Sequence, residues 1–180
     1  MNYICKIASP FGMLTVSSSG ASVTGLWIEG QKYYAESLTG GAIEKDLPIF
    51  ESVKEWLDCY FKGQEPAFTP PLAPEGSDFR QSVWKILRHI PYGEVTTYGE
   101  IARQLERQSP GKKVSAQAVG GAVGHNPISI MIPCHRVVGT NGSLTGYAGG
   151  ISAKIKLLQL ENVRLKMNEG KDAGKIAQKF

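Results

Sequence analysis

The sequence predicts two domains, a small α/β domain followed by a mostly α-helical domain with a helix-turn-helix. β-rich runs broken by Ser, Gly and Pro fill the first part of the chain, whereas apolar residues at helical spacing dominate the second. Between them lies TPPLAPEGS, which is typical of a linker. The net charge also changes sign there, from −3 over residues 1–74 to +7 over residues 75–180. We therefore expect domains at 1–74 and 75–167 and a flexible tail at 168–180.

Three short runs in the first domain predict strands of a small antiparallel meander: YICKI, MLTVSS and VTGLWI. The segment that follows, IFESVKEWLDCYFKG, predicts a helix. Ile49, Val53, Leu57 and Tyr60 share one face of it, and Gly63 ends the pattern. The first domain is thus expected to combine a sheet with a helix.

The second domain opens with DFRQSVWKILRHI. Its apolar residues Phe79, Val83, Leu87 and Ile90 recur at helical spacing and predict a helix over residues 78–90. The pattern stops before Pro-Tyr-Gly, a sequence that cannot continue a helix.

The next two helices suit a helix-turn-helix. TTYGEIARQL begins with a capping box, in which the Thr97 hydroxyl accepts from the third helical amide and Glu100 reaches back to Thr97. A basic loop, ERQSPGKK, leads to VSAQAVGGAVGHN, a helix that starts at Ser115. Gly120 and Gly121 each cost this helix about 1 kcal/mol relative to Ala, which close approach of another surface would justify. A polyanionic partner fits this basic region; tight internal packing and a solvated basic surface are the alternatives.

A last helix is predicted in SAKIKLLQLEN, where Ile155 and Leu158 form an apolar face that ends at Glu161. An acid in that position is usually exposed to solvent. It could instead point inward, toward whatever the apolar face packs against.

The composition, with 42% hydrophobic and 20% charged residues, is that of a soluble globular protein. No apolar run approaches the roughly 20 residues that span a bilayer, and MNYICKIASPFG lacks the apolar centre of a signal peptide. Cys5, Cys59 and Cys134 are an odd number of cysteines without a CxxC pair. We therefore expect no membrane association, no disulfide framework and a reducing, cytoplasmic setting in which a thiol is free to react.

Cys134 lies in IMIPCHRVVG, beside a potential base. A lone cysteine is often a small buried hydrophobe, and a metal site is disfavoured because no second Cys/His pair stands at ligand spacing. A nucleophilic cysteine needs a base and a group that orients the base. His135 could be the base, directly or through a water, Glu161 could orient the imidazole, and Asn126 could hold the local turn. The same set would also suit an acyl hydrolase.

PCHRVVG, preceded by AVGGAVGHNPISI and followed by GYAGG, resembles the active-site signature of the O6-alkylguanine-DNA alkyltransferases, also called methylated-DNA–protein-cysteine methyltransferases. The resemblance is strong over residues 78–165. It implies a ribonuclease-H-like first domain and a winged helix-turn-helix in the second. It also implies a DNA repair protein that moves the alkyl group of O6-alkylguanine irreversibly to its own cysteine, once per molecule, without a cofactor or a metal. Whether O4-alkylthymine is a substrate stays open.

The resemblance implies that Cys134 accepts the alkyl group. His135 would deprotonate the Cys134 thiol through a water, and Glu161 would complete the relay. Asn126 would join the helix-turn-helix to the active-site loop, and Tyr98 would give a proton to N3 of the departing guanine. The implied partner is double-stranded DNA, bound by a monomer through the minor groove with the damaged base flipped out.

The remaining implied residues form two groups. The base pocket would contain Tyr147, Val137 and Ala148. The DNA-binding surface would contain Gln117, Ser115, Ala118, Gly120, Gly121 and Arg136. Gln117 stands where the family usually has an arginine finger, so we expect weaker DNA binding or slower base flipping with the transfer chemistry intact. Ala148 stands where some members have a hydroxyl residue, so one hydrogen bond to guanine O6 would be missing.

Two alternatives remain beside a transferase. A damage sensor of the alkyltransferase-like type would bind the lesion without transfer, but those proteins replace the acceptor cysteine, whereas this chain has Cys134. A cysteine hydrolase would turn over repeatedly on an ester or amide.

Overall fold

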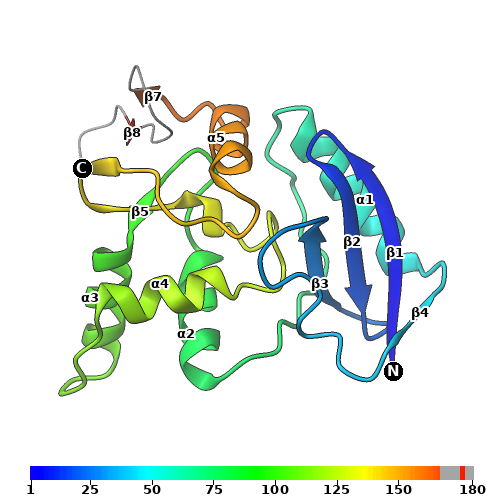
Figure 1. Ribbon diagram of the computed structural model, residues 1–180, viewed down its shortest axis with the longest axis horizontal. Coiled ribbons are helices and arrows are strands. Elements are labelled where there is room, and N and C mark those ends of the chain that lie inside the picture. Colours follow the sequence, from blue (N-terminus) through cyan, green and yellow to red (C-terminus); the bar gives the residue numbers. More distant parts are fainter. Residues whose placement is uncertain (167–174, 177–180) are drawn as a thin grey trace. The chain divides into compact units, whose positions relative to one another are not determined.

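The computed structural model describes residues 1–166 and 175–176 of the chain (Figure 1). The chain forms two compact units. The N-terminal unit contains residues 1–76 and also 127–131, a segment that the sequence analysis kept in the second domain. The C-terminal unit contains residues 77–126 and the chain from residue 132 onward.

A four-stranded sheet in the order β3-β2-β1-β4 forms the N-terminal unit together with one helix. β1 (Asn2–Ser9), β2 (Gly12–Ser18) and β3 (Val23–Ile28) pair antiparallel, which confirms the predicted meander. β4 (Ala42–Glu44) adds to β1 in parallel and is too short to show a periodicity in the sequence. The predicted helix is α1 (Pro48–Phe61).

The core of the N-terminal unit comes from one face of α1 and from β2 and β3. Val53 and Leu57 of α1 are buried, as are Val16 of β2 and Trp27 of β3. The Trp27 ring folds over Gly25, where a Cβ atom would lie 1.9 Å from a ring carbon, so only glycine fits at this position. Figure 1 shows α1 lying along the sheet.

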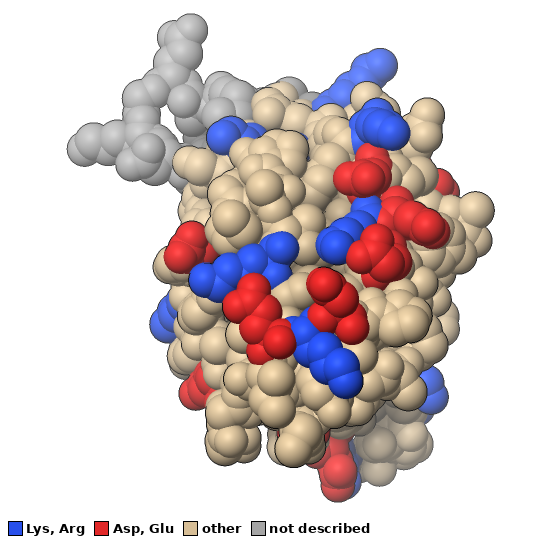
Figure 2. All heavy atoms as spheres, turned by 90° about the vertical axis from the view of Figure 1, so that its right-hand side faces the viewer, with Lys and Arg blue, Asp and Glu red and all other residues tan. Residues whose placement is uncertain are grey.

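Charged side chains of both signs are interspersed on the face of the molecule that Figure 2 shows. Such mixing is typical of a solvated protein surface. A surface that binds a polyanion gathers positive charge instead. This face therefore does not stand out as a nucleic-acid contact.

The C-terminal unit is mostly helical, as predicted. Its helices are α2 (Asp78–Leu87), α3 (Tyr98–Gln108), α4 (Ala116–Gly124) and α5 (Ile151–Leu160). α2, α3 and α4 contact one another. The buried indole of Trp84 donates a hydrogen bond of 2.8 Å to a carbonyl of α4, which fixes α2 against that helix.

α2 is shorter than the helix predicted over residues 78–90. It ends at Leu87, and the amides of His89 and Ile90 bond the carbonyls of Ile86 and Leu87 in a tighter turn. The physical reason is Pro91, since the residue before a proline avoids the α-helical region.

The caps of α3 and α4 agree with the prediction in part. The Thr97 hydroxyl accepts from the Glu100 amide at 3.1 Å, and the Ser115 hydroxyl accepts from the Ala118 amide at 3.0 Å. The expected bond from the Thr97 amide to the Glu100 carboxylate does not form. Instead, the Glu100 carboxylate binds Arg103 and Arg107 on the exposed side of α3. The prediction that Glu100 reaches back to Thr97 is therefore wrong.

Two short parallel strands, β5 (Thr96–Thr97) and β6 (Val137–Val138), place the start of α3 beside the chain that follows Cys134. Val138 packs in a small core with Leu144, Leu158 and Val163. This pairing brings two sequence-distant parts of the candidate site together.

The predicted tail at residues 168–180 lies outside the described residues except for β8 (Lys175–Ile176), which pairs antiparallel with β7 (Leu165–Lys166). Of the helices in the described part of the chain, none combines the length and the hydropathy that crossing a bilayer requires.

Candidate active site

Cys134 and His135 share one short 3-10 helix, η1 (Cys134–Arg136), and both side chains are buried. The Asn126 side-chain amide donates to the Cys134 Sγ at 3.2 Å and to the Ile132 carbonyl at 2.8 Å. One amide group thus fixes both the thiol and the backbone turn that leads into it.

Glu161 caps the C-terminal end of α5 and points inward, with only 2% of the residue exposed. Its Oε1 lies 2.6 Å from His135 Nε2. The structure therefore brings together the cysteine, the histidine and the acid that the sequence singled out, although they come from two separate segments of the chain.

Arg136 and a backbone amide also bind the Glu161 carboxylate. The guanidinium donates to both carboxylate oxygens, at 2.9 and 3.1 Å, and the Gly93 amide donates at 3.0 Å. Burial alone would raise the pKa of Glu161, but the hydrogen bonds and charges of His135 and Arg136 outweigh it and hold the pKa at about 2. Glu161 is therefore an anion at neutral pH.

An anionic Glu161 fixes the tautomer of His135. Nε2 keeps its proton and donates a hydrogen bond to Glu161, which leaves Nδ1 of the neutral imidazole without a proton and able to accept one. Burial lowers the pKa of His135, while Glu161 opposes this effect. His135 is thus neutral in the isolated protein, with Nδ1 able to accept a proton.

The Cys134 thiol is protonated in the isolated protein. Burial raises its pKa, and the hydrogen bond from Asn126 and the positive charge of Lys154 oppose that increase without cancelling it. A thiol in this state needs a base at the moment of reaction.

Lys154 is a component of the site that the sequence analysis missed. This fully buried side chain extends from α5, and its ammonium donates to the carbonyls of Val137 at 2.6 Å, Thr145 at 3.1 Å and Gly146 at 3.5 Å. Burial lowers its pKa to about 8, which leaves it charged at neutral pH. Its phase along the helix was the available signal, because a residue four positions before Leu158 lies on the same apolar face.

Two tyrosines are coupled electrostatically to Cys134. The Tyr98 hydroxyl donates to the carbonyls of Thr145 and Gly146, and burial followed by the Cys134 charge raises its pKa to about 12. The buried Tyr147 hydroxyl has no hydrogen-bond partner among the residues that the structure describes. Burial first, then the charges of Cys134 and Glu161, raise the pKa of Tyr147 well above its ordinary range. Both phenols are therefore protonated and able to donate.

The other two residues predicted for the base pocket flank this region. Val137 is buried, and its carbonyl is one of the acceptors of Lys154. Ala148 is half-buried and follows Tyr147 directly.

α4 presents a face of small, uncharged side chains to solvent. Ser115, Gln117, Ala118 and Gly121 are exposed, and a Cβ atom at Gly121 would meet nothing within 4 Å. Gly120 is half-buried, with the Tyr98 ring 3.8 Å from its ideal Cβ position. Tight internal packing therefore does not explain the glycine at position 121.

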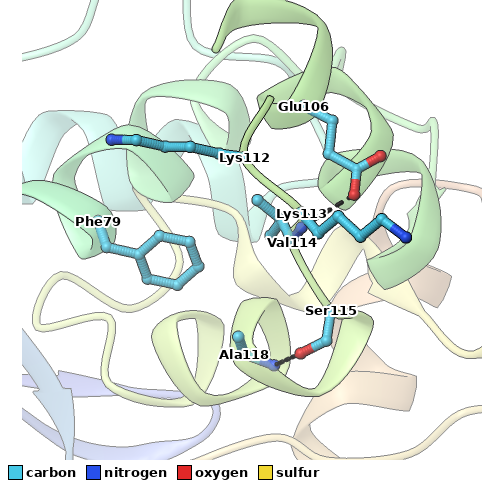
Figure 3. A pocket seen from close by; sticks show the side chains of 7 residues that line it. All are labelled: Phe79, Glu106, Lys112, Lys113, Val114, Ser115 and Ala118. Carbon is cyan, nitrogen blue, oxygen red and sulfur yellow. Dashed lines mark hydrogen bonds between the residues drawn. The ribbon is translucent and has the colours of Figure 1, made fainter. Parts of the chain in front are cut away.

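A hollow lies beside the N-terminal end of α4. It is lined by Phe79, Glu106, Lys112, Lys113, Val114, Ser115 and Ala118. The loop between α3 and α4 is tied back by a hydrogen bond of 2.9 Å from the Val114 amide to the Glu106 carboxylate. Figure 3 shows the two lysine side chains leaving this loop in different directions. Positive charge thus borders the uncharged face of α4.

Arg136 makes most of its contacts inside the unit. It was predicted at the DNA surface, yet its guanidinium binds Glu161 and donates to the Ile90 carbonyl at 2.6 Å, and its side chain is only 11% exposed. Its charge compensates the buried Glu161 carboxylate, and its DNA-binding role stays a prediction. Within residues 1–166 and 175–176, no group of three or more His, Cys, Asp or Glu side chains is arranged to hold a metal ion.

Comparisons with known proteins cover both units. A family model described as 6-O-methylguanine DNA methyltransferase, DNA binding domain, matches residues 78–163, and one described as the ribonuclease-like domain matches residues 2–74. A methylated-DNA–protein-cysteine methyltransferase of Haemophilus influenzae is 42% identical over 162 residues, which cover 89% of this chain and 87% of that protein. One from Mycobacterium tuberculosis is 46% identical over 158 residues, or 88% of this chain and 91% of that protein.

A solved structure is similar as well. The crystal structure of Mycobacterium tuberculosis OGT in complex with DNA matches with a TM-score of 0.77 and 43% sequence identity, over 88% of this chain and 92% of that chain.

Proposed function

This chain belongs to the 6-O-methylguanine DNA methyltransferase family, and on that basis we propose that Cys134 is the residue that accepts the alkyl group. The protein repairs DNA by moving the alkyl group of O6-alkylguanine irreversibly to one of its own cysteines. The observation that carries the assignment to Cys134 is the 2.6 Å contact between His135 and Glu161, with the thiol in the same turn as His135.

The reaction is an in-line displacement at the alkyl carbon. The Cys134 proton goes to Nδ1 of His135, directly or through a water, and the Cys134 sulfur forms the new bond to carbon. The bond between that carbon and guanine O6 breaks, and the guanine takes a proton at N3 from Tyr98. The product thioether has no leaving group that could restore the thiolate, so each molecule reacts once.

The damaged base must leave the duplex before this chemistry, because the O6 atom is out of reach inside the stack. We assign Tyr147, Val137 and Ala148 to the pocket that receives it. The unpartnered hydroxyl of Tyr147 supports this assignment, since a buried donor without an acceptor is costly and a polar base edge would satisfy it. Asn126 and Lys154 hold the two loops on either side of Cys134.

We assign DNA binding to a winged helix-turn-helix built from α3 and α4, with the loop after β6 as the wing. The small exposed face of α4, Ser115 to Gly121, would enter the minor groove, and Lys112 and Lys113 would contact phosphates. We further assign a ribonuclease-H-like fold to the N-terminal unit. All the proposed catalytic residues lie in one unit, so a monomer suffices, and a reducing compartment such as the cytoplasm suits a reaction that needs a free thiol.

Enlarging Gly121 separates DNA binding from folding. In Gly121→Leu the new side chain meets no protein atom at its Cβ, and loss of a helix-interior glycine raises stability by up to about 1 kcal/mol. The same side chain would block a close approach to DNA, so we expect the affinity for a lesion duplex to fall at least about tenfold, a loss of roughly 1.4 kcal/mol. Fluorescence anisotropy and thermal unfolding measure the two effects, with Gly121→Ala as the intermediate. Wild-type affinity in Gly121→Leu would remove α4 from the DNA interface.

The proposed function is tested by mass spectrometry of the intact protein and its peptides after incubation with a duplex that contains one O6-methylguanine. We expect a gain of one methyl group on the Cys134 peptide, saturating at one per protein and absent in Cys134→Ser. Lesion binding without a mass gain would indicate a sensor instead, and repeated turnover on an ester would indicate a hydrolase.

A further inference from the structure

The segment that leads into Cys134 is fastened to the sheet of the N-terminal unit. The Leu26 amide of β3 donates to the Pro127 carbonyl at 2.8 Å, and the Ser129 amide donates to the Leu26 carbonyl at 2.9 Å. These bonds form an isolated parallel bridge between Leu26 and Ile128, so residues 127–129 pair with the edge of β3.

A buried side-chain pair reinforces this attachment. Gln31 Oε1 accepts from the Ile28 amide at 2.7 Å, at the end of β3, and from the Ser129 hydroxyl at 3.2 Å. Ser129 is 1% exposed and Gln31 is 7% exposed. Removing Gln31 would leave the buried Ser129 hydroxyl without this acceptor, whereas Gln31 Oε1 is also fixed by the Ile28 amide. The Ser129 hydroxyl therefore binds a group that β3 already holds in place.

The residue after Ser129 has an unfavourable backbone conformation. Ile130 has φ of 70°, in the left-handed region that β-branched residues avoid, and its side chain is buried. The Met131 amide donates to the Ser129 carbonyl at 2.8 Å, which closes a γ-turn around Ile130. A conformation of this kind persists only where the chain is held on both sides.

The other side of the strained turn is held by Asn126. Its amide donates to the Ile132 carbonyl and to the Cys134 Sγ. Hydrogen bonds therefore fix this segment at Ser129, where it contacts Leu26 and Gln31, and again at Ile132 and Cys134, where it contacts Asn126.

We propose that Ser129 and Gln31 are positioning residues for Cys134, which hold the Ile130 turn and thereby fix the thiol against Asn126. This inference rests on the proposed function. Without the Ser129 hydroxyl, the turn at Ile130 relaxes toward an ordinary backbone conformation and the Ile132 carbonyl shifts. Because Asn126 binds this carbonyl and the sulfur with one amide group, the thiol loses part of its stabilisation and of its alignment.

Ser129→Ala tests the proposal, and Ser17→Ala is its matched control. Ser17 is also a fully buried serine of the N-terminal unit with one side-chain hydrogen bond, 2.8 Å to Thr24, but it lies on β2. We compare single-turnover transfer rates at saturating O6-methylguanine duplex, the affinity for that duplex, and the pH dependence of Cys134 alkylation by iodoacetamide without DNA.

We expect Ser129→Ala to transfer at least about tenfold more slowly than Ser17→Ala, since small misplacements of reacting groups cost up to about a hundredfold. The pH midpoint of Cys134 alkylation should move upward, while the affinity for the duplex stays within about twofold. A general loss of stability should affect Ser129→Ala and Ser17→Ala alike. A slower rate and a higher pH midpoint in Ser129→Ala alone would therefore indicate positioning of the thiol.

Equal rates and equal pH midpoints in the two variants would overturn the proposal. If Ser129→Ala does not fold at the assay temperature, Gln31→Met is measured in its place. This variant removes the acceptor of the Ser129 hydroxyl, and the same readouts test the proposal. Failure of the proposed function is a separate result, because the wild-type protein would then gain no methyl group on Cys134.

Discussion

Replacing Glu161 by glutamine should both destabilise the protein and nearly stop alkyl transfer. The neutral amide keeps the shape of the carboxylate but removes the charge that balances the mostly buried Arg136 and orients His135. Breaking a buried ion pair costs about 3–5 kcal/mol. Loss of an oriented general base slows reactions by about a hundredfold to ten-thousandfold. Urea unfolding and single-turnover transfer on an O6-methylguanine duplex measure the two effects.

Glu100→Gln is the matched control for the stability effect. Its carboxylate also binds two arginines, Arg103 and Arg107, but on the exposed surface of α3. Water screens such pairs, so this variant should lose far less stability than Glu161→Gln. Similar losses in the two variants would show that the buried network around Glu161 does not hold the fold.

The same carboxylate predicts how stability depends on pH. The pKa of Glu161 is about 2 in the folded protein, below its ordinary value of 4.5. A lowered folded-state pKa contributes stability that is complete above about pH 4.5 and disappears as the pH falls toward 2. At 1.36 kcal/mol for each pKa unit, the contribution is about 3 kcal/mol. The free energy of unfolding should therefore fall more steeply in the wild-type protein than in Glu161→Gln across this range.

Much of the site could be predicted because its signals are local in the sequence. Cys134 and His135 are adjacent, and Glu161 ends an apolar helical face, so its inward orientation was among the possibilities. The hydroxyls of Thr97 and Ser115 cap the helices that follow them, as local pattern alone predicts.

The features that escaped prediction depend on what a side chain faces in three dimensions. Arg136 and Lys154 belong to residue types that are usually exposed, and only the assembled unit shows that each satisfies buried acceptors. The attachment of Ser129 to Gln31 joins residues 98 positions apart. Ile130, directly after Ser129, has a left-handed backbone conformation that no property of isoleucine indicates.

Replacing Lys154 by methionine should slow alkyl transfer, and it should destabilise the fold by less than the loss of its hydrogen bonds alone. Two opposing terms set the stability. The carbonyls of Val137, Thr145 and Gly146 lose a donor, which costs about 1–3 kcal/mol for each group left unsatisfied. Against this, burial lowers the pKa of Lys154 from 10.5 to about 8, so removing the charge returns about 3 kcal/mol of desolvation. Three carbonyls at these values lose about 3–9 kcal/mol in total, so the net loss in the free energy of unfolding is about 0–6 kcal/mol.

The effect on the reaction is not offset in this way. The ammonium of Lys154 opposes the increase that burial causes in the pKa of Cys134, so without it the thiolate forms less readily. We expect the pH midpoint of the transfer rate to rise and the rate at neutral pH to fall at least about tenfold. Lys156→Met removes an exposed ammonium from the same helix and should change neither quantity. A Lys154→Met protein with an unchanged pH profile would show that Lys154 only ties the loops together, and the thiolate would then depend on Asn126 and His135 alone.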